Sequence, residues 1–304
     1  MNREISVCAS RFFNYLTAMK IKITLWLLLL IAAPGCSIHK KINVFSPDGN
    51  IKLEISARTD DGNPGFTIKA GDRKILLPSF IQLKSNASFQ KNDYRVIRIE
   101  SNSITNKWIN NFGERRKISD NYNQVKIFLM NNGISVNLIC RAYNEGVAFA
   151  YEFPEQEGHD SLTVTDERIV FRFPSDYLVW SASRAQAEYS HVPLSKTDIG
   201  SERPLVIEID STLVIALAEA RLVDYARMKF EPDSASGIGI RTRLGSEVHK
   251  SLPFQSPWRV IMIGKNPGDL LEKNYLLLNL NDPSEIDDIS WITPGKVLRE
   301  VSLS

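Results

Sequence analysis

Cysteine and histidine are scarce in this chain of 304 residues, which holds three cysteines and four histidines. Cys8 and Cys36 lie near the N-terminus, so only Cys140 remains in the body of the sequence. A disulfide framework is therefore excluded, and the core must supply the stability of the fold. The histidines are too far apart to form a metal-binding motif: His39, His159, His191 and His249.

A surplus of charge of one sign is also missing. The chain has 37 Lys and Arg residues against 35 Asp and Glu residues, which gives a formal net charge of +2 at pH 7. The basic residues are scattered among the acidic ones, and this pattern excludes nucleic acid as a partner. The sequence contains neither a glycine-rich phosphate loop nor a Gly-x-Ser-x-Gly nucleophile elbow.

A long apolar run occurs once, at residues 25–33. Lys20 and Lys22 precede the run, and small residues follow it up to Cys36. This order is typical of a secretory signal, and the run is too short for a comfortable membrane span. Because Cys36 directly follows a glycine, the site resembles the processing site of a bacterial lipoprotein. We expect Cys36 to carry lipid; cleavage near Cys36 without lipid is the alternative.

Apolar and polar residues alternate with a period of two in most of the remaining chain. Turn formers such as Asn131-Asn-Gly133 and Asn144-Glu-Gly146 bound the alternating stretches. This pattern predicts an all-β fold in which antiparallel sheets pack as a large sandwich. Residues 211–227 are ambiguous, but their first half favours a strand. The alternating stretches are residues 51–56, 134–140, 147–153, 169–173, 205–209 and 213–217.

Several short phrases follow one another in a fixed order. They are Ser46-Pro-Asp-Gly-Asn50, Trp108, Gly113-Glu-Arg115, Asp120-Asn-Tyr-Asn123, Arg141-Ala-Tyr-Asn-Glu-Gly-Val-Ala-Phe149, Glu188-Tyr189, Glu219-Ala220, Pro253-Phe-Gln-Ser-Pro-Trp-Arg259 and Ser290-Trp-Ile-Thr-Pro-Gly-Lys296. In this order the phrases resemble the N-terminal domain of glycoside hydrolase family 97, from about residue 45 onwards. The resemblance implies a large antiparallel β-supersandwich of the galactose-mutarotase-like kind, followed in the family by a (β/α)8 barrel.

The same resemblance implies an exo-acting α-glucosidase or α-galactosidase that uses calcium and acts on α-linked oligosaccharides. In the family the catalytic carboxylates lie on the barrel, and the N-terminal domain packs against the barrel and completes its pocket. Glycoside cleavage needs two suitably spaced carboxylates, and no such pair can be placed here by spacing. We therefore expect a pocket-completing domain that is inactive alone. The alternative is a stand-alone sugar-binding lipoprotein of the cell envelope.

The chain is expected to divide into five segments. A lipid anchor would place the protein in the bacterial cell envelope, in the periplasm or at the outer membrane, and would be its only contact with a membrane. The segments are spurious upstream translation (1–18), a lipoprotein signal peptide (19–36), a tether (37–45), the family 97 β-sandwich domain (46–290) and a truncated entry to the barrel (291–304).

Three residues are candidate calcium ligands. The resemblance implies that Glu188 is a ligand, with Asn144 and Glu219 as the next candidates. Calcium takes six to eight oxygen ligands, so one or two from this domain would bind it only together with the barrel. For Asn144 a tight turn is the competing explanation, because Gly146 tolerates positive φ.

Four residues are candidate sugar contacts. Glu219 and Ala220 match a position where family members present a polar motif to the sugar, normally with a histidine where Ala218 stands here. Glu219 is expected to accept a hydrogen bond from a sugar hydroxyl, and a cross-strand ion pair is the alternative. Trp180 and Tyr189 could stack on sugar faces, because amphipathic aromatic rings suit sugars, or could pack in the structure.

Overall fold

The computed structural model describes residues 41–59, 62–86, 94–233, 235 and 237–296. The expected signal peptide and lipidated Cys36 lie outside the described residues. Residues 41–45, which the sequence assigned to a tether, form strand β1 (Lys41–Phe45) and pair with β2 (Ile51–Ser56). Burial of Ile42 and Val44 explains why this segment belongs to the fold.

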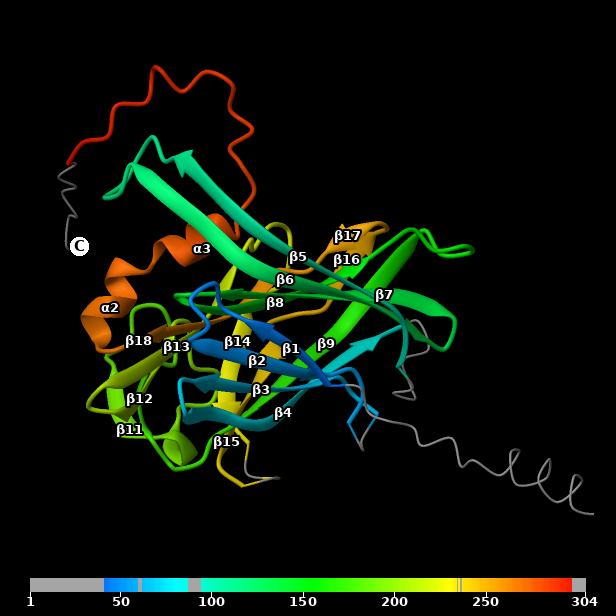
Figure 1. Cartoon of the computed structure of the whole chain (residues 1–304), viewed down its shortest axis with the longest axis horizontal. Helices are drawn as coiled ribbons and strands as arrows, with labels where there is room; N and C mark the ends of the chain where they lie inside the picture. The colour runs from blue at the N-terminus through cyan, green and yellow to red at the C-terminus, as the bar shows by residue number, and fades with distance from the viewer. Residues whose placement is uncertain (1–40, 60–61, 87–93, 234, 236, 297–304) are drawn as a thin grey trace, which may run out of the picture. The chain divides into compact units, whose positions relative to one another are not determined.

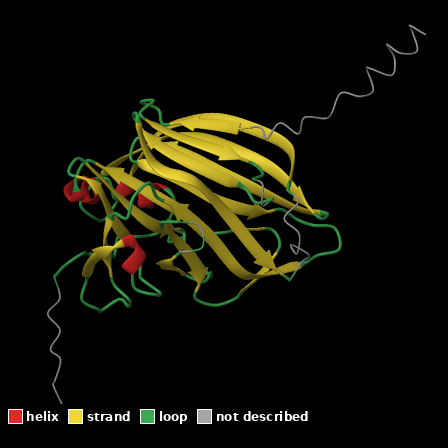
Figure 2. Ribbon diagram, turned by 90° about the horizontal axis from the view of Figure 1, so that it is seen from below, coloured by secondary structure: helices red, strands yellow, loops and turns green. Residues whose placement is uncertain are grey.

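Two antiparallel sheets lie as layers in the described part of the chain, as the all-β prediction requires (Figures 1 and 2). The first sheet has the order β1-β2-β3-β4-β9-β15-β14, and β16 also pairs with β9. Its other strands are β3 (Gly65–Ala70), β4 (Arg73–Ser85), β9 (Ser161–Arg172), β14 (Met228–Pro232), β15 (Gly239–Leu244) and β16 (Val248–Ser251).

The second sheet has the order β11-β10-β12-β13-β18-β8-β7-β6-β5, with β17 beside β8. One short helix follows β11 and two follow β18, its last strand in sequence. Its strands are β5 (Arg95–Ile109), β6 (Lys117–Asn131), β7 (Ile134–Tyr143), β8 (Gly146–Phe153), β10 (Leu178–Ser181), β11 (Ser190–Pro193), β12 (Leu205–Asp210), β13 (Leu213–Ala220), β17 (Phe254–Gln255) and β18 (Trp258–Gly264). The helices are the 3-10 turn η1 (Leu194–Lys196), α2 (Pro267–Glu272) and α3 (Tyr275–Asn279).

The main core lies between the two sheets and follows directly from the alternation. In β13, Ile215 and Leu217 are fully buried in this core. Ala216 and Ala218 belong to a second apolar cluster on the opposite face of the same strand. The first half of the ambiguous segment is therefore a strand with both faces covered, which explains its weak contrast between apolar and polar positions.

Helices α2 and α3 cover the outer face of the second sheet. The side chain of Asn266 caps α2 by accepting a hydrogen bond from the backbone of Asp269, and Pro267 opens the helix. Leu270 and Leu276 are buried against the sheet. Alanines on the facing strands let these short helices approach closely.

The hairpin of β5 and β6 extends beyond the rest of its sheet, and the segment after α3 passes beside the tip (Figure 1). The acidic residues Asp282, Glu285, Asp287 and Asp288 of this segment are exposed. No helix in the described ranges has both the length and the apolar composition that crossing a bilayer requires.

Candidate functional site: an ionic network and the loop beside it

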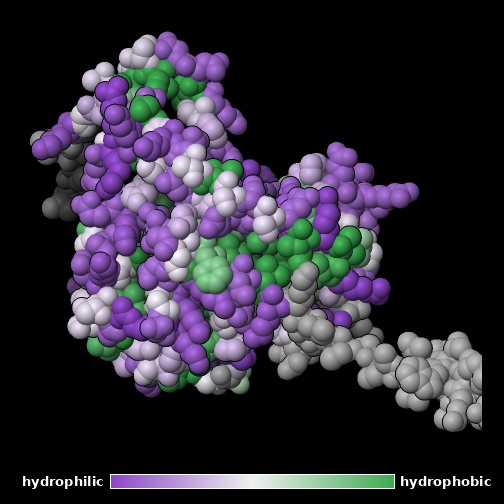
Figure 3. Space-filling view, in the orientation of Figure 1, coloured by the Kyte–Doolittle hydropathy of each residue, from purple (hydrophilic) through white to green (hydrophobic). Residues whose placement is uncertain are grey.

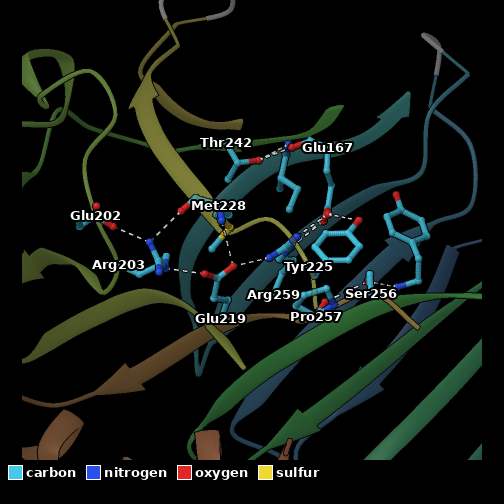
Figure 4. A network of polar contacts seen from close by, with 12 residues as sticks. Glu167, Glu202, Arg203, Glu219, Tyr225, Met228, Thr242, Ser256, Pro257 and Arg259 are labelled. Atoms are coloured by element: carbon cyan, nitrogen blue, oxygen red, sulfur yellow. Dashed lines mark hydrogen bonds and ion pairs between the residues drawn. The ribbon is translucent and has the colours of Figure 1, made fainter. Parts of the chain in front are cut away.

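Glu219 lies near the end of β13 and points between the two sheets (Figure 4). It shares this face with Ile215 and Leu217, because side chains alternate along a strand. Arg259 of β18 is its direct cross-strand neighbour, and Arg259 Nη1 donates a hydrogen bond to Glu219 Oε2 at 2.7 Å. The ion pair that the sequence left open as an alternative is therefore present.

Arg259 also joins the two sheets. Its Nε and Nη2 donate to Glu167 Oε1 and Oε2 of β9 at 2.7 and 2.5 Å. The side chains of Arg259 and Glu167 are each 1% exposed. The Tyr225 hydroxyl lies 3.5 Å from Glu167 Oε2 (Figure 4). A buried guanidinium thus has a bidentate carboxylate partner in one sheet and a second carboxylate in the other.

Arg259 and Tyr225 each keep one protonation state near neutral pH. Burial by itself would lower the pKa of Arg259, but the charges of Glu167 and Glu219 outweigh burial and hold this pKa above its ordinary value. Burial, followed by the charge of Glu167, raises the pKa of Tyr225 above its ordinary range. Arg259 therefore stays cationic and Tyr225 stays neutral, so the network is suited to holding a conformation rather than to transferring protons.

The chain of ion pairs continues from Glu219 towards the surface. Glu219 Oε1 lies 2.6 Å from Arg203 Nε, a charge contact outside hydrogen-bond geometry. The backbone N–H of Met228 donates to Glu219 Oε2 at 3.2 Å. Arg203 Nη1 donates to Glu202 Oε2 at 2.6 Å, and Glu202 also pairs with Lys229. Both carboxylate oxygens of Glu219 are thus engaged by protein groups.

Glu202 connects the network to the base of the loop between β10 and β11. Its backbone N–H donates to the carbonyl of Ala182 at 2.8 Å. Beside this contact, Ser181 Oγ donates to Asp198 Oδ2 at 2.9 Å and lies 3.0 Å from Ser201 Oγ. Ser181 and Ser201 are fully buried. Two irregular segments, 182–189 and 194–204, are therefore fastened together where they leave the sheet.

The structure places three of the predicted site residues near this loop. Glu188 and Tyr189 lie on its exposed part. Trp180 lies on β10 just before the loop, 39% exposed, and its ring stacks on His191 with a centroid distance of 4.3 Å. Its Nε1 donates to Glu208 Oε1 at 2.8 Å, which fixes the plane of the indole.

Asn144 lies at the other end of the sheet. It follows β7, which runs antiparallel to β10 with four strands between them, so the structure does not bring Asn144 to Glu188. Asn144 Oδ1 accepts a hydrogen bond from the backbone of Asp48 at 3.1 Å, and Gly146 has a φ of +152°. Both observations fit the turn that the sequence offered as the competing explanation.

The described residues do not form a calcium cage by themselves. Within the described ranges, no group of three or more His, Cys, Asp or Glu side chains could hold a metal ion. Glu188 presents an exposed carboxylate, but calcium needs six to eight oxygens. A calcium ion at Glu188 would therefore take most of its ligands from outside these residues.

Ala218 and Ala220 face away from Glu219, towards α2 and α3. This follows from the alternation of β13, in which neighbouring side chains point to opposite faces. The side chain at position 218 and the carboxylate of Glu219 therefore point to opposite faces of this strand.

A cluster of aromatic and charged side chains on the outer face of the second sheet was not among the predicted site residues. The guanidinium of Arg141 lies 4.3 Å from the ring centroid of Tyr122 and 4.4 Å from that of Trp258. Arg141 Nη1 also reaches the hydroxyl of the fully buried Tyr143 at 3.4 Å. Burial raises the pKa of the nearby Asp120, against the opposing charge of Arg141. Three of the family phrases carry these residues. They are the phrases that begin at Asp120, at Arg141 and shortly before Trp258.

Two hollows flank helices α2 and α3. One, of about 560 Å³, is mostly apolar, and its lining residues include Ala216, Ala218 and Leu271 together with Glu219 and Arg203. The other, of about 670 Å³, lies between the β5–β6 hairpin and the segment after α3. In the space-filling view, apolar atoms gather near the tip of this hairpin (Figure 3).

Comparison with known proteins gives relatives that are longer than this chain. A retaining alpha-galactosidase of Bacteroides thetaiotaomicron is 24% identical, and the alignment covers 91% of this chain and 46% of that protein. A probable retaining alpha-galactosidase of Streptomyces bingchenggensis is 22% identical, with 92% and 44% covered. The chain thus spans somewhat less than half the length of these relatives.

Solved structures agree with the sequence relatives. A glycoside hydrolase family 97 enzyme from Pseudoalteromonas sp. strain K8, in complex with acarbose, superposes with a TM-score of 0.76 at 27% identity. The superposition covers 84% of this chain and 40% of that enzyme. A beta-arabinopyranosidase shares the fold with a TM-score of 0.65 at 20% identity.

The family model described as glycosyl-hydrolase 97 N-terminal matches residues 44–283, which is most of the part that the structure describes. The match contains every strand from β2 to β18 and both helices. The order of phrases, the two-sheet architecture and this match agree, and the chain belongs to the glycosyl-hydrolase 97 N-terminal family.

Proposed function

We propose that this chain is the N-terminal part of a calcium-dependent, exo-acting α-glycoside hydrolase that removes terminal α-galactosyl or α-glucosyl units. The observation that carries the proposal is the family match over residues 44–283 in a chain that covers less than half of its relatives. Both relatives are named as α-galactosidases, and solved family 97 structures hold panose and acarbose. The catalytic carboxylates belong to the part of the relatives that this chain does not match, so the chain alone is inactive.

The loop between β10 and β11 is the part of this domain that completes the pocket. Glu188 supplies an exposed carboxylate for calcium, and Tyr189 supplies an exposed ring for sugar contact. Trp180 adds an indole whose plane is held by His191 and Glu208. Rigid aromatic rings beside a polar loop suit the alternating CH and OH faces of a sugar.

The catalytic barrel docks on the outer face of the second sheet. Leu222 and Leu271 are exposed at the apolar hollow, and Ile286 and Trp291 are exposed on the segment that follows α3. Soluble monomers seldom leave so many apolar side chains exposed on neighbouring elements. The proposal also places the protein in the bacterial cell envelope, anchored by lipid on Cys36, which lies outside the described residues.

A chimaera tests the proposed function. Residues 41–283 replace the matching part of the Bacteroides relative, and hydrolysis of aryl α-galactosides and aryl α-glucosides is measured with and without a calcium chelator. We expect turnover that the chelator abolishes, and a higher calcium requirement in the Glu188→Ala version. The catalytic part of the relative without any N-terminal domain is the control. Turnover of either substrate by the unfused chain would overturn the proposal.

Isothermal titration separates this function from a stand-alone sugar-binding protein. Melibiose, maltose and galactose are titrated into the unfused chain. We expect no saturable heat, because the pocket needs the second domain. Saturable binding that the Trp180→Ala variant loses would favour the stand-alone function.

A further inference from the structure

We propose that Glu219 and Arg203 are positioning residues, which hold the loop of Glu188 and Tyr189 in place without touching sugar. The functional meaning of this role rests on the proposed function, but the role itself concerns contacts within this chain. It assigns to Glu219 a task different from the sugar contact that the sequence suggested.

The side chain of Glu219 is buried, and protein groups face both of its carboxylate oxygens. Its side chain is 4% exposed. One oxygen faces Arg203, and the other accepts from Arg259 and from the backbone of Met228. A sugar hydroxyl would have to displace a charged partner in a buried site, and leaving a buried charge unpaired costs more than one hydroxyl contact returns.

Arg203 transmits the position of Glu219 to the loop. Its guanidinium contacts Glu219 on one side, and on the other side donates to Glu202 and to the backbone carbonyl of Met228 at 3.3 Å. Glu202 is the residue whose backbone binds Ala182, the first residue of the loop. An unbroken line of contacts therefore runs from the intersheet core to the point where the loop begins.

The loop has few contacts of its own to replace this anchor. Residues 183–186, 188 and 189 are exposed. The backbone N–H of Ala187 donates a hydrogen bond to the carbonyl of Arg184, which belongs to the same loop. A short exposed segment of this kind takes its position from its ends. A hydrogen-bonded cluster of Ser181, Asp198 and Ser201 fixes the same base, so a second anchor stands beside the ionic one. Weakening the ionic anchor should loosen the loop while the sheets stay intact.

Hydrogen exchange followed by mass spectrometry on the full chain tests the proposal. One variant is Glu219→Gln, which keeps the shape of the side chain and removes its charge. The other is Arg203→Lys, which keeps the charge and removes the guanidinium group that contacts several partners at once. Asp233→Asn is the matched control, because Asp233 is a buried acid paired with Arg168 at 3.1 Å on the first sheet. We expect peptides that cover residues 182–204 to exchange at least about tenfold faster in both variants. Peptides of β7 and β8 should not change.

Three results would overturn the proposal. The first is unchanged exchange of residues 182–204 in Arg203→Lys. The second is an equal acceleration across β7, β8 and the loop, which would mean a general loss of stability. The third is the same loop acceleration in Asp233→Asn. Because exchange needs neither substrate nor a barrel, these results stand even if the chimaera is inactive.

Discussion

Single side chains in this domain have roles that depend on the face of the strand they occupy. Glu219 contributes to an ionic network between the sheets, whereas its neighbour Ala218 lines an apolar hollow under two helices. The residue that bridges the sheets, Glu167, lies 92 positions from Arg259 in sequence. No spacing rule links two residues so far apart, so the sequence predicted an ion pair for Glu219 only as an alternative and could not predict the bridge.

Replacing Arg259 by methionine should be strongly destabilising. The change leaves Glu167 buried without its cation and Glu219 with Arg203 alone, and removing one partner of a buried ion pair costs about 3–5 kcal/mol of unfolding free energy. Urea unfolding measures the loss. Arg73→Met, which removes an exposed pair with Asp210, is the control and should cost less than about 1 kcal/mol. Equal losses in the two variants would contradict the argument.

Glu202 should make stability depend on pH in the acid range. Burial raises the pKa of Glu202, but its contacts with Lys229, Arg203 and Arg227 outweigh burial, so the pKa in the folded chain lies below its ordinary value. A lowered folded pKa contributes stability that is present above the ordinary value of 4.5 and is lost as pH falls through the folded pKa. Urea unfolding at decreasing pH should show a smaller loss in Glu202→Gln than in the parent chain; parallel curves would refute this.

Strands were more predictable than the elements between them. The six alternating stretches are confirmed: five lie wholly within β2, β7, β8, β12 and β13, and residues 169–173 run one residue past the end of β9. The hairpin of β5 and β6 was not predicted, since most residues of β5 are exposed on both faces and show no apolar alternation. Helices α2 and α3 have six and five residues, too few to show a helical period.

The turn between β7 and β8 should not tolerate a side chain at Gly146. A Cβ atom there would lie 2.2 Å from the carbonyl oxygen of Ile261, and the φ of +152° is unfavourable for other residues. Gly146→Ala should therefore cost about 3 kcal/mol or more of unfolding free energy. Gly133→Ala is the matched control: its φ is +86°, but nothing lies within 4 Å of the added atom, so about 1 kcal/mol is expected. Thermal unfolding compares the two variants.

The described domain as a whole combines a well-filled interior with an outer surface that is only partly covered. Two apolar clusters lie on either side of the second sheet, and helices α2 and α3 cover part of the outer one. Sequence patterns predicted the sandwich because both sheets obey one simple alternation. They could not predict which outer surface stays bare, because an apolar residue under a helix and one in an open hollow look alike in sequence.

The purified chain should self-associate through this bare surface. Leu222 and Leu271 are exposed beside the apolar hollow, and contiguous apolar surface promotes association. The double variant Leu222→Lys, Leu271→Lys should remain monomeric in sedimentation velocity at concentrations where the parent chain associates. A matched pair of lysines at Val96 and Ile97 on β5 should have no such effect. A parent chain that stays monomeric at every concentration would contradict this prediction.

The alternation of β13 also has a genetic consequence. Residues 218 and 219 are adjacent codons that serve different layers of the protein, so a missense change at one leaves the layer of the other untouched. Loss of one codon earlier in the strand is a different lesion, because every later side chain would turn to the opposite face. The carboxylate of Glu219 would then lie under α2 and α3, and a methyl group would stand between Arg203 and Arg259. In this strand an in-frame deletion of three nucleotides is thus a heavier lesion than a missense change at either codon.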